Sequence, residues 1–93
     1  MDFSFRGAYY FALADELAAA SQFAPAADEY EQVIQLRPGL SIARLDHGVM
    51  LARLDRFDEA LLEFQEILRR DPDNQQAREY FGRVQSWKNS GRQ

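Results

Sequence analysis

Cysteine is absent from this chain of 93 residues, and histidine occurs once, as His47. Without cysteine the chain can form neither a disulfide framework nor a thiolate metal site, so a reducing compartment is allowed. Any catalytic pair of acid and base would have to use carboxylates, and no second histidine or cysteine could complete a zinc set. No glycine-rich loop precedes a helix to hold phosphate. These absences predict no enzymatic activity, no cofactor and no metal.

Long hydrophobic runs are also missing. Residues 1–6 contain no basic run, and Asp15 and Glu16 interrupt the apolar stretch 8–14. This pattern fits neither a signal peptide nor a membrane-spanning helix. We therefore expect no membrane insertion and a cytoplasmic location.

Positive charge is scarce until the last segment of the chain. The net charge is −5 over residues 1–36, −2 over residues 37–74 and +3 over residues 75–93. An acidic body would repel phosphates, so a nucleic-acid partner is not expected. The change from an acidic N-terminal part to a basic C-terminal part has two interpretations. The charges lie on solvated helix faces, or they favour head-to-tail contacts between molecules.

The clearest pattern that is present is a repeat with a period of 34 residues. Four positions of the first copy, in the order small, aromatic, β-branched and proline, return in the second. They are Ala26, Tyr30, Val33 and Pro38, which recur as Ala60, Phe64, Ile67 and Pro72. This period and this order of residues are typical of stacked helical hairpins, and they favour a binding scaffold.

Apolar residues follow helical spacing throughout, and no segment alternates as a half-buried strand does. We expect five helices, covering residues 3 or 7 to 20, 25–36, 41–54, 58–70 and 75–87, with fraying from residue 88 onward. Pro25 is predicted to open the second helix, and Ser41 and Asp58 to cap the third and fourth. The acidic loop at residues 71–74 lacks the glycine and terminal glutamate of a calcium loop, so a helix cap is the favoured interpretation.

The second repeat carries residues of a recurring helical-hairpin pattern, small, apolar or aromatic with a closing proline, at Gly48, Leu51, Phe57, Ala60, Phe64 and Pro72. The first repeat has matching residues at Tyr10, Leu13, Ala14, Leu17, Phe23, Ala26, Tyr30 and Pro38. With these residues the chain resembles the tetratricopeptide family. The resemblance implies an all-α fold, a right-handed α-solenoid of two antiparallel hairpins with a fifth, capping helix. It divides a single domain, 1–93, into repeats at about 7–40 and 41–74, a cap at about 75–88 and a tail at 89–93.

In tetratricopeptide proteins the first helix of each hairpin lines a concave groove, which binds a peptide or a partner protein. The resemblance implies that this groove is built here from Phe11, Asp15, Ala18, Ile42, Leu45, Asp46, Val49, Arg53, Glu79 and Arg83. The acidic members would favour a basic flank of the ligand and the arginines an acidic flank. The positions that hold a chaperone's terminal carboxylate in some relatives carry no cation here, so that type of binding is not expected.

The third helix departs from the family pattern. Ile42, Leu45, Val49 and Ala52 form an apolar stripe, while Arg44 and His47 occupy slots that are usually apolar. The stripe is either ordinary core or an exposed groove. His47 is expected to be a hydrogen-bonded structural residue.

Self-association is the alternative to partner binding, and a homodimer would be its simplest form. The apolar groove or the N-terminal aromatics Phe3 and Phe5 would form the interface, unless these aromatics pack on the first hairpin instead.

Small residues at the helix crossings provide a first test. A large side chain at Gly48 or Ala60 would push two helices apart. We expect Gly48→Leu and Ala60→Leu each to lower the free energy of unfolding by at least the ~1–3 kcal/mol of ordinary overpacking. Urea denaturation measures this loss, and an unchanged midpoint in either variant would contradict the packing role.

Overall fold

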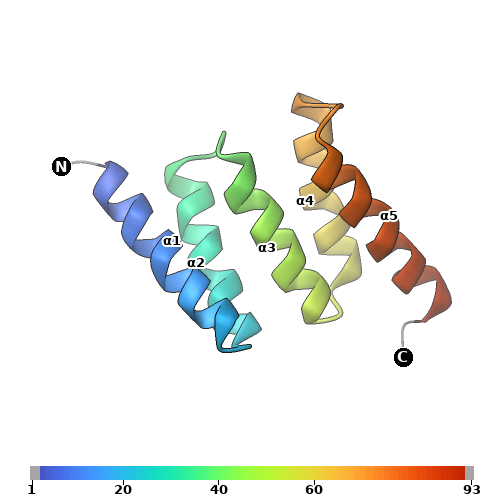
Figure 1. Ribbon diagram of the computed structural model, residues 1–93, viewed down its shortest axis with the longest axis horizontal. Helices are drawn as coiled ribbons and strands as arrows, with labels where there is room; N and C mark the ends of the chain where they lie inside the picture. Colours follow the sequence, from blue (N-terminus) through green and yellow to red (C-terminus); the bar gives the residue numbers. More distant parts are fainter. Residues whose placement is uncertain (1–2, 92–93) are drawn as a thin grey trace.

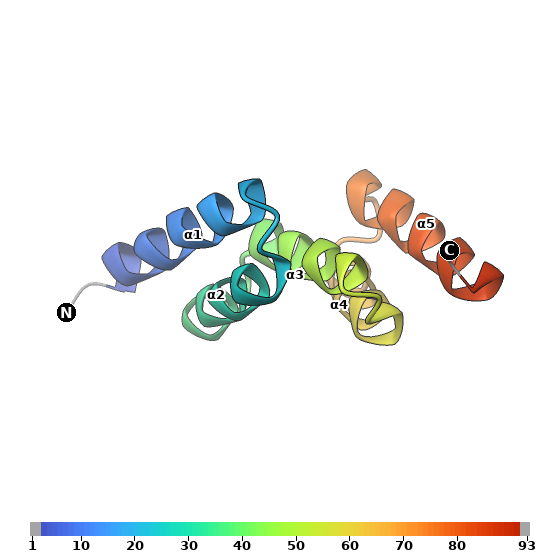
Figure 2. The same cartoon turned by 90° about the horizontal axis from the view of Figure 1, so that it is seen from below.

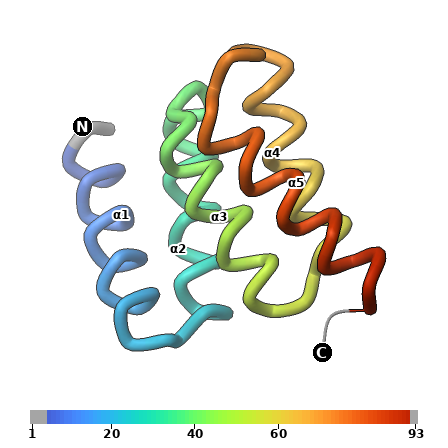
Figure 3. Tube along the Cα trace, turned by 45° about the vertical axis from the view of Figure 1, so that its right-hand side comes forward, coloured from blue at the N-terminus to red at the C-terminus, as the bar shows by residue number. Residues whose placement is uncertain are grey.

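The computed structural model describes residues 3–91, which form five α-helices and no strand within that range (Figure 1). The helices are α1 (Phe3–Ala19), α2 (Phe23–Leu36), α3 (Ser41–Arg53), α4 (Phe57–Arg70) and α5 (Gln75–Ser90). Each helix runs antiparallel to the one before it and packs against it (Figure 3). The predicted all-α solenoid, with two hairpins and a fifth helix, is confirmed.

The helices lie in two rows. Figure 2 shows α1, α3 and α5 along one side and α2 and α4 along the other. The molecule is elongated, with extents of 46 × 30 × 16 Å. Most contacts join consecutive helices, and α3 also touches α5. Because each element is stabilised by its immediate neighbours, the central helix α3 links the two ends of the array.

Small residues are fully buried where helices cross, as the sequence predicts. Ala14 of α1 and Ala26 of α2 have no exposed surface, and neither has Ala60 of α4. Gly48 of α3 faces the ring of Phe64 so closely that a Cβ atom built on the glycine would lie 2.6 Å from Cε1 of that ring. The absence of a side chain at Gly48 therefore sets the separation of α3 and α4.

The two repeated aromatics connect successive layers of the array. Tyr30 is 3% exposed and makes an edge-to-face contact with Phe11 of α1, with ring centroids 5.8 Å apart. It also belongs to the core cluster that contains Met50 of α3. Phe64 is fully buried and stacks on Tyr80 of α5 at the same centroid distance of 5.8 Å. Both rings fill the equivalent spaces that the repeat predicts.

Several helix starts differ from the predictions. Helix α2 begins at Phe23, so Pro25 lies inside its first turn. The N–H groups of the first turn have no partner within the helix, so the N–H that proline lacks costs no hydrogen bond there. Ser41 is the first residue of α3 and makes no capping hydrogen bond, because Leu40 occupies the N-cap position. Arg56 is the N-cap of α4, and Asp58 lies within the first turn. The predicted caps at Ser41 and Asp58 are therefore wrong.

The last helix starts as predicted and ends later. Asn74 caps it, because its Oδ1 accepts a hydrogen bond from the backbone N–H of Ala77 at 3.0 Å. The helix continues to Ser90 and is terminated by Gly91 in the left-handed conformation, with φ of 70°. Residues 88–90 are thus helical rather than frayed, and Lys88 Nζ lies 2.6 Å from Asp58 Oδ1 on α4. The remainder of the predicted tail, 92–93, lies outside the described residues.

The N-terminal aromatics do not both support the predicted packing on the first hairpin. Phe5 is 75% exposed, so that prediction is wrong for Phe5. The side chain of Phe3 lies outside the part of the chain whose side chains are described. Over residues 3–91, every helix falls short of the length or apolarity needed to cross a membrane.

The contact of Gly48 with Phe64 yields a matched pair of glycine variants. Gly48→Ala places a methyl group against the buried ring and should lower the free energy of unfolding by about 1–3 kcal/mol. Gly82→Ala, on the open face of α5, meets nothing within 4 Å and should raise it by about 0.5–1 kcal/mol through helix propensity. Urea titrations compare the two, and a stabilised Gly48→Ala protein would contradict the close approach.

Candidate functional site

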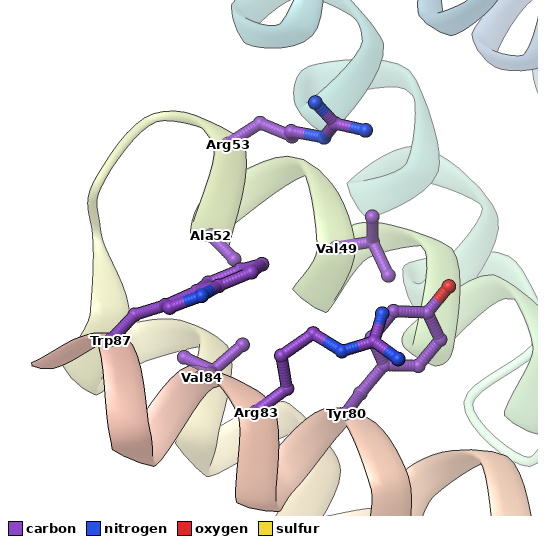
Figure 4. A pocket seen from close by; sticks show the side chains of 7 residues that line it. All are labelled: Val49, Ala52, Arg53, Tyr80, Arg83, Val84 and Trp87. Atoms are coloured by element: carbon purple, nitrogen blue, oxygen red, sulfur yellow. The ribbon is translucent and has the colours of Figure 1, made fainter. Parts of the chain in front are cut away.

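A pocket of about 330 Å³ lies between α3 and α5, on the side of the molecule that also carries α1 (Figures 2 and 4). Three of its lining residues come from α3 and four from α5. They are Val49, Ala52 and Arg53, with Tyr80, Arg83, Val84 and Trp87. The four α5 residues are spaced by three, one and three positions, so they share one face of that helix.

The floor of the pocket is apolar and its walls are aromatic. Ala52 is 3% exposed and Val84 is fully buried, while Tyr80 and Trp87 are half-buried. Figure 4 shows the indole of Trp87 beside Ala52 and Val84. Such a surface can bind an apolar side chain of a ligand, because that side chain would move from water into contact with the apolar residues of the pocket.

Two exposed arginines stand at the rim. The guanidinium of Arg83 lies 5.4 Å from the centroid of the Tyr80 ring, and that of Arg53 lies 5.4 Å from the centroid of the Phe23 ring. Neither arginine forms an ion pair with any residue in the range 3–91. The aromatic rings hold both cations in place while leaving their N–H groups available to a carboxylate.

Two carboxylates lie between α1 and α3. The hydroxyl of Tyr30 donates a hydrogen bond of 2.6 Å to Oδ1 of Asp15. Burial, and then the negative charge of Asp15, raise the pKa of Asp46 to about 6. Burial also raises the pKa of Tyr30, and the hydrogen bond to Asp15 adds to this effect. This part of the surface is acidic, whereas the pocket beside α5 is basic.

The predicted groove residues do not all lie together. Val49, Arg53 and Arg83 line the pocket, and Asp15 and Asp46 form the acidic pair. Four others lie apart from that pocket. Phe11 packs on Tyr30, Ala18 joins the core of the first hairpin, and Ile42 and Glu79 are exposed elsewhere.

Leu45 requires a correction. It is 5% exposed, belongs to a hydrophobic core cluster and does not line the pocket between α3 and α5. Ala52 is likewise buried, Val49 is half-buried and Ile42 is 44% exposed. The apolar stripe of the third helix is therefore ordinary core at Leu45, which residues of α4 and α5 cover, whereas Ala52 and Val49 border the pocket.

Arg44 and His47, the polar residues in the usually apolar slots, both bind Glu63 of α4. Arg44 Nη1 donates to Glu63 Oε1 at 2.9 Å, and its Nη2 donates to the carbonyl of Pro38 at 3.2 Å. Nδ1 of His47 is hydrogen-bonded to Oε2 of Glu63. The predicted hydrogen bond of His47 is therefore present.

Sequence reasoning missed Tyr80 and Trp87 as pocket residues. Their spacing with Val84 was visible as an apolar face of the fifth helix. The sequence predicts this helix only as a cap, and the neighbour opposite its apolar face, α3, is known only from the packing.

Comparison with known proteins yields one relative of note. The chain is 34% identical over 68 residues to a UDP-N-acetylglucosamine–peptide N-acetylglucosaminyltransferase of Giardia intestinalis. The match covers 73% of this chain and 5% of the transferase, so the chain spans only a small fraction of that relative's length. No family model matches the chain, and no solved structure matches it.

The raised pKa of Asp46 predicts a pH dependence of stability. The folded-state pKa of about 6 exceeds the ordinary value of 3.8, so the stability contributed by the protonated form is present below pH 4 and is lost as the pH rises through 6. We expect Asp46→Asn to be more stable than the wild type at pH 7, by about 1–3 kcal/mol, and equal to it at pH 4.

Urea titrations between pH 4 and 7 measure this difference. Glu66→Gln is the control, because hydrogen bonds and charges from Arg69 and Arg70 lower the pKa of Glu66 to about 2, and its neutralisation should bring no gain at pH 7. A constant difference between Asp46→Asn and the wild type at every pH would contradict the burial of this carboxylate.

Proposed function

We propose that this chain is a tetratricopeptide-type interaction module without catalysis of its own. In this proposal the two repeats, 7–40 and 41–74, and the fifth helix present the row α1, α3 and α5 to a peptide segment of a partner protein. The observation that carries the proposal is the pocket between α3 and α5, where Arg53 and Arg83 flank an apolar and aromatic surface without ion-pair partners among the described residues.

The chemistry of the pocket selects the kind of segment. An apolar side chain would enter between Val49 and Trp87, and a carboxylate on its flank would bind the guanidinium groups. An extended or helical segment that continued toward α1 would meet Asp15 and Asp46, where a lysine or arginine fits. The preferred ligand is therefore an apolar residue with acidic neighbours on one side and a basic residue farther along.

The comparison supports a protein partner at a coarse level. The Giardia transferase is named for its action on peptides, and the similarity extends over most of this chain. The match covers too little of that protein for its activity to be transferred here. It fits the view that this chain contributes recognition of a polypeptide.

Self-association is a second candidate, favoured by the outer face of α1. Phe5 is 75% exposed and Tyr9 is 64% exposed, and a shallow pocket beside Tyr9 is bordered by Leu13. Two copies could bury these aromatics against each other. Light scattering over a range of concentrations tests this candidate, since a monomer at every concentration would exclude it.

Trp87 is the sole tryptophan and lies in the pocket, so its fluorescence can report binding directly. Short peptides with a central leucine and acidic, neutral or basic flanks are titrated into the full chain. We expect the acidic series to bind, and Arg53→Glu/Arg83→Glu to weaken its affinity at least tenfold, because two attractive charges become repulsive.

Arg78→Glu is the matched control. Arg78 is exposed on α5 outside the pocket. Its substitution by glutamate reverses one positive charge, as each substitution in the pocket variant does, but leaves the pocket lining unchanged. Equal weakening by the control would reveal a general charge effect. Binding that was indifferent to peptide charge, or absent from all three series, would overturn the proposed site.

A further inference from the structure

A second cluster of functional side chains lies away from this pocket, where α2, α3 and α4 meet. Each helix contributes one residue, and one potential ligand atom from each of Glu31, His47 and Glu63 lies within 4.8 Å of the other two. The three residues come from positions far apart in the sequence, and none of them lines the pocket between α3 and α5. No part of the proposed peptide site depends on them.

The orientation of the imidazole is determined by Glu63. Oε2 of Glu63 is hydrogen-bonded to Nδ1 of His47, and Oε1 of the same carboxylate accepts from Arg44 at 2.9 Å. With both oxygens engaged, Glu63 is held in place and can accept the proton of Nδ1–H. The tautomer that results leaves the lone pair of Nε2 available. Carboxylates hold metal-binding histidines in this way.

The free nitrogen faces a second carboxylate. Oε1 of Glu31 lies 3.6 Å from Nε2 of His47. Two ligands bound to tetrahedral zinc at about 2.0–2.1 Å lie about 3.4 Å apart, so an ion can bridge these atoms after a small movement. The side chain of Glu31 is 45% exposed, which leaves it free to make that movement.

Space and further ligands lie beside this pair. A cavity of about 300 Å³ is bordered by Glu31 and His47 together with Asp28, Arg56 and Glu59. Arg56 binds both carboxylate oxygens of Glu59, at 2.7 and 2.8 Å, which leaves Asp28 as the further carboxylate available to an ion. The side chain of His47 is 12% exposed, so its ring is held by the protein while the residue still borders the cavity. The cavity can hold an ion, its water ligands and one more carboxylate.

We propose that this cluster is a binding site for a divalent transition-metal ion of the zinc type. His47 Nε2 and Glu31 are the protein ligands, the carboxylate of Asp28 and water complete the coordination, and Glu63 positions the imidazole. Counting cysteine and histidine in the sequence could not detect this set, since its carboxylates are contributed by the helices on either side of α3 rather than by a motif. Imidazole and carboxylate ligands suit zinc and its neighbours.

Calorimetric titration of the metal-free full chain with zinc chloride at pH 7.5 tests the site. We expect saturable binding of one ion per chain and a rise in the midpoint of thermal unfolding. Glu31→Gln should weaken the affinity at least tenfold, and so should His47→Gln. Glu66→Gln, which removes another carboxylate of α4 that is not part of the cavity lining, should leave the affinity unchanged.

His47→Gln can disturb the α3–α4 contact, so the helicity of this variant is checked by circular dichroism. Glu31→Gln changes a half-exposed side chain outside that contact, so its affinity for zinc tests the site even if His47→Gln does not fold. Absence of saturable binding would overturn the proposal, as would wild-type affinity in Glu31→Gln. A protein in which zinc has no effect, but Glu31→Gln lowers the midpoint of unfolding, would show instead that an imidazolium ion bridges the two glutamates.

Discussion

The close approach of α3 and α4 at Gly48 is the constraint on which the rest of the structure depends. The ring of Phe64 occupies the volume that any side chain at position 48 would need, and the same ring stacks on Tyr80 of the next helix. Helix α3 also packs against α2, and α5 touches it across the pocket. One backbone contact therefore sets the position of the helix that connects both hairpins, and with it the width of the pocket.

The charges follow from this packing. Helix α3 has no fully buried charge, yet it carries polar groups on two faces. On the face toward α4, Glu63 receives both Arg44 and His47. On the side of the molecule formed by α1, α3 and α5, the acidic and basic residues of α3 lie apart. Asp46 lies near Asp15 of α1, and Arg53 borders the pocket with α5. A single helix thus presents distinct chemistry to each side.

The two ends of the array differ in the surface that they present. The outer face of α5 carries small and polar residues, and the helix ends at Gly91. A polar outer face is what the solvent-exposed terminal helix of a repeat array requires. The outer face of α1 carries exposed aromatics, among them Phe5 and Tyr9. Contact with a partner would bury more apolar surface at this face than at the outer face of α5, which favours self-association as the second candidate.

The sequence by itself determined the helical class, the five elements and the small and aromatic residues of the core, because helical spacing and the recurrence of Ala26 and Tyr30 as Ala60 and Phe64 are local properties of the chain. Helix caps were less accurate, since capping depends on backbone geometry within one residue. Only the tertiary structure decided that Leu45 is buried while Trp87 lines a pocket, and that Glu31 faces His47. The rotation of each helix about its axis is set by its neighbours, and that rotation determines which side chains meet.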